Sequence, residues 1–478
     1  MRSTATILTA LALGGAMTAH ACGTEAEFAK IRKRALASSS GASVGANTGP
    51  AAGANTVATA TRTDEASAAQ VTNPAQECAI YSYPPVTALQ AAKVFPPIWE
   101  IANLSTASTE VSALFTSLNG SVPKISPKGT PTGDFSGVTY NGVEDPDCWW
   151  TYKQCTTPKA KGVQPDVTRC PEPNTWGFTL DDGPNCSHNA YYDFLEQQKQ
   201  KATLFYIGSN VLDWPLEAQR GLADGHEICA HTWSHRYMTS LSNEQVFAEL
   251  YYSKKAIKDV IGVTVQCWRP PYGDVDDRVR YIAQSLGMTT VIWEDNTFDY
   301  EVGTLGATKV QANYNDIFAK AANGTYNTHG TIVLTHELNN DTMMLGQENL
   351  AEMQKAFKVV APVAVCYNNS QPYVEKAGYT YPNFAQWTAG TTSISLAAPT
   401  AVSTDAALSI PLSTGISSGA SVTSTVGYQQ SAAAAASSGK ATTGAKSGAA
   451  RVDSGLFAGT FGAVVVGAVG AGVLAVLA

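Results

Sequence analysis

The chain has 478 residues, of which 44% are hydrophobic and only 15% are charged, and its formal net charge is −8. It lacks the basic stripe that a nucleic-acid ligand would require, so this class of partner is excluded. All nine tryptophans lie between Trp99 and Trp387. We therefore expect one large folded region between disordered flanks that bury too little apolar surface to fold.

The first residues are typical of a secretory signal. Arg2 precedes an apolar stretch, and Ala19-His20-Ala21 forms a small-x-small cleavage site. We predict a signal peptide over 1–21, with a short buried helix as the alternative. The dibasic pair at 33–34 indicates a pro-segment over 22–34, whose removal would also remove Cys22.

Residues 35–77 are predicted to be a disordered linker. The stretch from Cys78 to Cys170 contains four cysteines and the pair Trp149-Trp150, which indicates an ordered N-terminal extension over 78–169. The two tryptophans fit a packed core, and a sugar-stacking platform is the alternative.

From Thr175 onwards, short apolar runs alternate with helical patterns. Helical periodicity marks 243–261, with capping residues before it, and similar patterns mark 276–286 and 341–360. Strands that alternate with helices predict βαβ units and a parallel sheet or barrel. The predicted strands are 175–180, 203–207, 226–230, 265–268, 289–293, 331–334 and 362–367.

Reactive side chains follow five of these strands. In parallel α/β folds the active site lies at the carboxyl ends of the strands, so we expect these side chains to meet there. The residues, in chain order, are Asp181-Asp182, His231 with His235, Arg269 to Tyr272, Asp295 to Asp299, and Thr335-His336-Glu337.

His231 and His235 are four residues apart and can point at one ion. Asp182 would complete three protein ligands and leave a fourth position for water, which is the layout of a catalytic zinc site. Taken locally, Asp181-Asp182 more readily indicates a helix cap or a solvated turn, because adjacent carboxylates on one strand normally face opposite sides. At a strand end followed by Gly183-Pro184, both can nevertheless reach one cleft.

Together these motifs resemble those of the polysaccharide deacetylases of carbohydrate esterase family 4, the NodB homology domain. The matching segments are 179–182, 231–235, 269–272, 296–300 and 334–336. The resemblance implies a distorted (β/α) barrel of about seven strands over 170–370. The fourth segment departs from the family, with Asn296 and Tyr300 where Asp and Trp are usual, and Asp295 could partly compensate.

The resemblance also implies the metal site and the general base. A divalent metal, usually zinc with cobalt as an alternative, would bind Asp182, His231 and His235. Asp181 would act as general base on the attacking water, with Arg269 orienting it.

The remaining roles concern the substrate. By the same resemblance, His336 would be the general acid, with Asp299 holding its ring. The backbone N–H of Tyr272 would stabilise the tetrahedral oxyanion, and Leu334 would line the pocket for the acetyl methyl group.

The activity implied is metal-dependent hydrolysis of the N-acetyl groups of chitin, giving chitosan and acetate, by a monomer that binds chitin or its oligosaccharides. A second hypothesis keeps the chemistry and changes the polymer to peptidoglycan or acetylated xylan. A third is a non-catalytic, chitin-binding wall mannoprotein that kept the fold. The presence of Asp181 beside the three ligands speaks against the third, because a binding module has no use for a general base.

Eight cysteines remain once Cys22 is removed, and an even number in a secreted chain predicts disulfides, with 105 pairings open. After the aspartate pair, a disulfide from Cys186 could hold the loop, or a glycan on Asn185 could crowd the cleft. The predicted N-glycosylation sites are Asn103, Asn119, Asn185, Asn323, Asn340 and Asn368.

The C-terminal part is poor in aromatic and charged residues. The Ser/Thr/Ala/Gly-rich stretch 388–446 predicts an O-glycosylated stalk. Small residues, a short spacer and an uncharged tail over 456–478 predict a GPI-attachment signal over 447–478 with Ser447 as the attachment residue, and a retained membrane anchor is the alternative. We expect a secreted protein at the cell wall and cell surface, held to the plasma membrane by a GPI anchor.

Overall fold

The computed structural model describes residues 62–390 and Ile394. The predicted signal peptide, the pro-segment, nearly all of the stalk and the GPI signal with Ser447 lie outside these residues. Among the residues that are described, no helix combines the length and the apolar character needed to cross a membrane.

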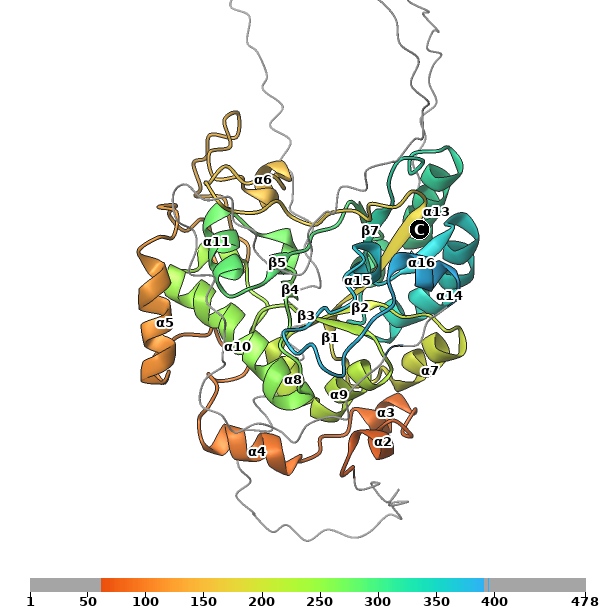
Figure 1. The fold of residues 1–478 in the computed structure, drawn as a ribbon, viewed down its shortest axis with the longest axis horizontal. Helices are drawn as coiled ribbons and strands as arrows, with labels where there is room; N and C mark the ends of the chain where they lie inside the picture. Colours follow the sequence, from red (N-terminus) through yellow and green to blue (C-terminus); the bar gives the residue numbers. More distant parts are fainter. Residues whose placement is uncertain (1–61, 391–393, 395–478) are drawn as a thin grey trace, which may run out of the picture. The chain divides into compact units, whose positions relative to one another are not determined.

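A parallel β-sheet forms the centre of the described part (Figure 1). Its strands follow the order β5-β4-β3-β2-β1-β7-β6, and β8 pairs with β1 beside this path. The predicted parallel α/β architecture is therefore confirmed. The strands are β1 (Thr175–Gly183), β2 (Thr203–Tyr206), β3 (Glu227–Ala230), β4 (Cys267–Trp268), β5 (Thr289–Thr290), β6 (Asp295–Asn296), β7 (Thr331–Leu334) and β8 (Val359–Ala361).

The sheet has to curl into a distorted barrel. Its two ends, β5 and β6, are joined by residues 291–294 alone. A flat sheet of seven strands would place its edges roughly 29 Å apart at about 4.8 Å per strand. The connection can span at most about 18 Å. Val167 lines the free edge of β5, because its N–H donates to Thr290 O at 2.9 Å and its carbonyl accepts from Ile292 N at 2.8 Å.

Helices follow the strands and surround them (Figure 1). The predicted helix 243–261 is confirmed as α10, which begins with a capping box between Ser242 and Gln245 and ends at Gly262 with φ 98°. The helices around the sheet are α7 (Asn189–Gln197), α8 (Gly208–Asp213), α9 (Pro215–Ala223), α10 (Asn243–Ile261), α11 (Asp277–Ser285), α12 (Val302–Leu305), α13 (Ala307–Ala322), α14 (Asn340–Ala356), α15 (Val363–Cys366) and α16 (Phe384–Thr388).

The predicted strand 362–367 is wrong. Strand β8 ends at Ala361, and the next residues form the short helix α15. Side chains on two strands bind the first N–H groups of this helix: Val363 N donates to Thr203 Oγ1 and Ala364 N donates to Glu227 Oε2, both at 2.8 Å. These partners are about 140 residues or more away in sequence, so a local apolar pattern cannot reveal them.

The folded part begins earlier than the predicted linker 35–77 allows. Residues 62–77 contain α2 (Glu65–Ala68) and α3 (Pro74–Glu77), and the extension continues with α4 (Pro84–Ala91), α5 (Thr109–Asn119) and α6 (Trp150–Lys153). Arg62 forms a buried ion pair with Glu217 of α9 at 3.3 Å, and Glu77 accepts from Asn189 N at 2.8 Å. Polar contacts hold residues 62–77 in place, so the prediction of disorder from their low aromatic content was wrong for this segment.

The eight cysteines are all paired, as the even number predicted. Two of the bonds join distant parts of the fold: one links the extension to the loop after β1, and the other links the entry of β1 to α15. The pairs are Cys78–Cys186, Cys148–Cys155, Cys170–Cys366 and Cys229–Cys267.

Glu227 provides a test of the packing between β3 and α15. Burial raises the pKa of this carboxyl from 4.5 to about 7, although Thr203 and Ala364 donate hydrogen bonds to it. Between these two pH values the unfolded chain loses a proton that the folded chain keeps, so stability should fall as pH rises. In Glu227→Gln this part of the fall should be absent, a difference on the order of 1–3 kcal/mol.

The measurement is urea unfolding of both proteins at pH 5 and pH 8. Glu352→Gln, which removes an exposed carboxyl on α14, is the matched control and should keep the wild-type pH dependence. The same pH dependence in Glu227→Gln and wild type would show that Glu227 is ionised in the folded protein.

Candidate active site

A β-bulge at the end of β1 places two neighbouring carboxylates on the same side of the strand. Asp181 pairs with Phe205 and Gly183 pairs with Tyr206, so Asp182 is an extra residue in the register, and its φ is 73°. His231 Nε2 lies 3.8 Å from Asp181 Oδ2 and 3.3 Å from Asp182 Oδ1. The bulge therefore removes the objection that adjacent strand residues face opposite ways.

Asp182, His231 and His235 form a compact cluster of ligand atoms. The Nε2 atoms of the two histidines lie 3.3 and 3.1 Å from Asp182 Oδ1, and one ligand atom from each residue lies within 4.8 Å of the others. Both Asp182 oxygens and His231 Nε2 are buried and make no hydrogen bond within the described part of the chain. Burying a carboxylate in this way is costly unless a cation compensates it, so the three residues fit a divalent metal.

The protonation states also suit metal ligation. His231 Nδ1–H donates to Arg269 O at 2.8 Å, which leaves Nε2 facing Asp182. Burial lowers the pKa of His235 to about 4, so its imidazole is neutral at pH 7.

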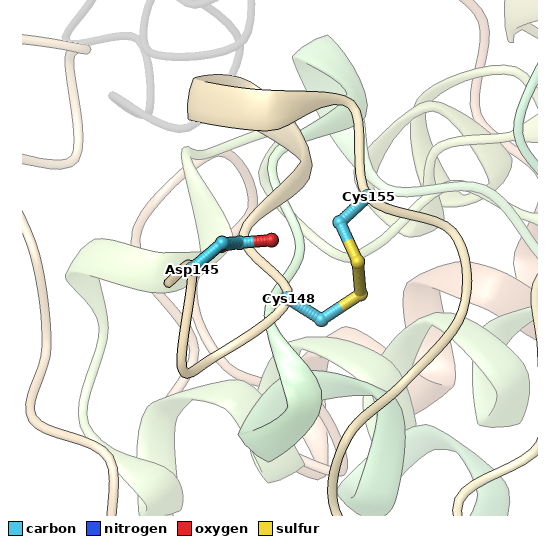
Figure 2. Close-up of side chains that lie close together, drawn as sticks. All are labelled: Asp145, Cys148 and Cys155. Atoms are coloured by element: carbon cyan, nitrogen blue, oxygen red, sulfur yellow. A yellow bond between two sulfur atoms is a disulfide. The ribbon is translucent and has the colours of Figure 1, made fainter. Parts of the chain in front are cut away.

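Two other clusters contain residue types that bind metals, but their cysteines are not available. Figure 2 shows Asp145 beside Cys148 and Cys155, whose sulfur atoms are joined in a disulfide. The group around Glu227 likewise contains the disulfide Cys229–Cys267. A disulfide sulfur is not a thiolate ligand, so Asp182, His231 and His235 form the candidate metal site among the described residues.

Asp181 is held by a fully buried arginine. Arg269 Nη1 donates to Asp181 Oδ1 at 2.6 Å and to Thr179 Oγ1 at 2.9 Å, and its guanidinium lies 4.1 Å from the ring centre of Phe205. The pair fixes one carboxylate oxygen of Asp181. The other oxygen, Oδ2, makes no hydrogen bond within the described residues and faces the cluster of ligand atoms, 3.8 Å from His231 Nε2.

His336 is positioned across the site by Asp299. One Asp299 oxygen accepts from His336 Nδ1–H at 2.6 Å, and the other accepts from the His336 backbone N–H at 2.8 Å. His336 also forms a parallel bridge with Asp181 at the end of β1. The strand ends thus bring a candidate base, a candidate acid and a ligand cluster into one buried group, as the sequence predicted.

Comparison with known proteins places the chain in a family. Residues 168–291 match the sequence model of the polysaccharide deacetylases. Chitin deacetylase 2 of Cryptococcus neoformans var. grubii is 55% identical over 340 residues, which are 70% of this chain and 74% of that relative. The chain belongs to the polysaccharide deacetylase family.

Two further proteins are similar to it. The chitin deacetylase of Amylomyces rouxii is 48% identical over 330 residues, covering 68% of this chain and 77% of that relative. The solved chitin deacetylase from Colletotrichum lindemuthianum is 23% identical, with a TM-score of 0.39, and the match covers 42% of this chain and 90% of that structure. Deacetylases of this family depend in general on a divalent metal.

The departures in the fourth family motif have a structural explanation. Asp295 does not compensate for the missing aspartate, because its oxygens accept hydrogen bonds from Tyr326 and Thr331 at 2.7 Å and pair with Lys320. It ties β6 to its neighbours instead. Asn296 Oδ1 accepts from Phe298 N and shapes the turn, and the ring of Tyr300 packs edge-on against His336 at 5.0 Å.

Two substrate residues and the glycosylation sites remain predictions. Leu334 is buried at the end of β7, two residues before His336, and alternate strand residues share a face. Asn185 is half-buried and its Nδ2 donates to Leu338 O at 2.7 Å, while the disulfide Cys78–Cys186 holds its loop. Four of the other predicted glycosylation sites are exposed and Asn103 is half-buried.

The sequence analysis missed two groups that contact site residues without being assigned a role in the reaction. The Phe205 ring under Arg269 and the Tyr272 hydroxyl at His235 were not predicted. Phe205 lies within a predicted strand, but no local pattern distinguishes it from an ordinary core residue. Tyr272 was singled out for its backbone N–H alone.

Replacing Asp182 tests the ligand set. Asp182→Asn keeps the size of the side chain and removes its charge. Zinc affinity should fall by more than the roughly 10–100-fold that is lost when a residue hydrogen-bonded to a metal ligand is replaced. Equilibrium dialysis with elemental analysis measures the affinity. The matched control Asp341→Asn removes an exposed carboxylate at the start of α14 and should bind zinc like the wild type. Unaltered zinc binding in Asp182→Asn would exclude it as a ligand.

Proposed function

We propose that this deacetylase removes the acetyl groups of N-acetylglucosamine residues in chitin, giving chitosan and acetate, with zinc bound by Asp182, His231 and His235. The observation that carries the proposal is that two adjacent carboxylates have different partners. Among the described residues, Asp182 faces the imidazoles of His231 and His235 without a hydrogen bond, whereas Asp181 is paired with Arg269. The relatives at 55% and 48% identity, both named chitin deacetylase, support the substrate.

The bound metal would polarise the amide carbonyl and lower the pKa of a coordinated water. Asp181 Oδ2, which faces the ligand cluster, accepts the proton of the attacking water as general base. Arg269 keeps Asp181 in one orientation through the 2.6 Å contact to Oδ1. Cobalt is the second metal that we expect to serve.

His336 acts as general acid toward the departing amine. Because Asp299 holds the Nδ1 side of the ring and the backbone N–H together, Nε2 is the atom that donates the proton. Tyr272 has φ 60°, in the left-handed region, and its backbone N–H is our candidate for binding the oxyanion. Leu334 is our candidate for contact with the acetyl methyl group.

We propose further that the protein acts as a monomer at the cell surface. The proposed base, acid and metal ligands all belong to one chain, so the proposed reaction requires no residue from a partner subunit. The sequence pattern over 447–478 supports a GPI anchor at Ser447.

Acetate release from chitin oligomers tests the activity. A chelator should abolish release by the wild type, and added zinc or cobalt should restore it. Asp181→Asn should retain its metal and bind oligomers, yet turn over roughly 10²–10⁴-fold more slowly, because a positioned general base is lost. Wild-type turnover in Asp181→Asn would refute the assigned mechanism. Oligomer binding without acetate release by the wild type would favour the non-catalytic, chitin-binding alternative.

Mass spectrometry of the mature protein tests the anchor. We expect the last peptide to end near Ser447 and to carry a lipid-linked glycan, and a phosphatidylinositol-specific phospholipase should release the protein from cells. Peptides that extend through Ala478 would show that the tail is kept as an anchor.

A further inference from the structure

The two histidines of the proposed metal site are held by different kinds of partner. His231 Nδ1–H donates to a backbone carbonyl, that of Arg269, which no side-chain change can remove. His235 Nδ1 instead lies 3.1 Å from the hydroxyl of Tyr272, with the two rings edge to face at 4.6 Å. Since His235 Nε2 faces Asp182, its Nδ1–H donates to the Tyr272 oxygen when the ligand atom is Nε2.

His235 and Tyr272 both need support from outside, because both have left-handed backbone conformations, with φ 54° and φ 60°. The ring of Tyr237 supplies it. It stacks on the ring of Tyr272 with a centroid distance of 4.0 Å and an interplanar angle of 7°. Both tyrosines are buried, so the stack fixes the direction of the Tyr272 hydroxyl.

The N-terminal extension in turn holds Tyr237. Gly133 has φ 89°, and a Cβ built on it would lie only 2.5 Å from the Tyr237 ring, so the backbone of the extension rests directly on that ring. Phe135 packs edge-on against Tyr237 at 5.4 Å and against Trp149 at 5.2 Å. These extension residues precede residue 168, where the match to the family begins.

We propose that Tyr272 and Tyr237 are positioning residues through which the extension fixes the orientation of the metal ligand His235. The proposal rests on the proposed metal site. It assigns a role to the side chain of Tyr272 in addition to the expected role of its backbone N–H. It also gives the extension a part in metal binding that the family domain alone does not contain.

Tyr272→Phe isolates the hydroxyl, because the ring, the stack on Tyr237 and the backbone N–H are all kept. The zinc dissociation constant, measured by chelator competition, should rise about tenfold, the lower end of the effect of removing a hydrogen-bond partner of a metal ligand. The visible absorption of the cobalt-loaded protein should also change, while the unfolding temperature of the metal-free protein should not. An unchanged zinc dissociation constant would overturn the role of the hydroxyl.

Tyr237→Leu and Phe135→Leu test the link to the extension, because Tyr237 stacks on Tyr272 and Phe135 packs against Tyr237. Each should raise the zinc dissociation constant and alter the cobalt spectrum. If a variant that folds has the wild-type zinc dissociation constant and cobalt spectrum, the link to the extension is overturned. As a control, Tyr140→Phe removes a hydroxyl whose partners are Asp145 and the backbone N–H of Asp147, and it should bind zinc normally. If the wild type itself binds no metal, the proposed function fails instead, so the two failures are distinguishable.

Discussion

The active site depends on one extra residue in β1. Without the bulge at Asp182, neighbouring carboxylates would face opposite sides of the strand, and either the candidate base or the candidate metal ligand would be lost. Contacts from two sides hold the bulge. Asn210 Nδ2 donates to Asp182 O at 2.8 Å, and the carboxyl of Glu337 covers Gly183 so closely that a Cβ there would lie 1.6 Å from Glu337 Oε1. A side chain at 183 would have to displace the buried Glu337 carboxyl, which favours glycine at this position.

The three buried aspartates of the candidate site differ in their partners, and this difference matches the roles that we propose for them. Asp181 is paired with a guanidinium, and Asp299 accepts two hydrogen bonds from His336. Asp182 faces only imidazoles, one of which has its pKa lowered to about 4 by burial. Within the described part of the chain, Asp182 has neither a guanidinium partner nor such hydrogen bonds, so it is the carboxylate at which a cation would add most.

Sequence predicted those parts of the fold in which local pattern and final structure agree. Helix α10 has its capping box and terminal glycine in the sequence, and β7 is a short apolar run that ends in the motif containing His336. The errors share one cause, which is contact between distant residues. Segment 362–367 is a helix because Thr203 and Glu227 bind its first N–H groups, and Asp295 turns away from the site because Tyr326 and Thr331 bind it. Disulfide pairing likewise had no local signal.

The extension also contacts the part of the barrel in which the strands are shortest. Strands β4, β5 and β6 have two residues each, so few backbone hydrogen bonds hold this side together. Val167 adds the missing pairing at the edge of β5, Trp150 packs against Trp293 at 4.9 Å, and Asp166 pairs with the buried Arg280 of α11 at 2.7 Å. These contacts lie on the side that also contains Tyr272. The family domain that begins at 168 is therefore only part of the folded unit, and the chain before it completes the barrel and contacts the residues that we propose to support the metal site.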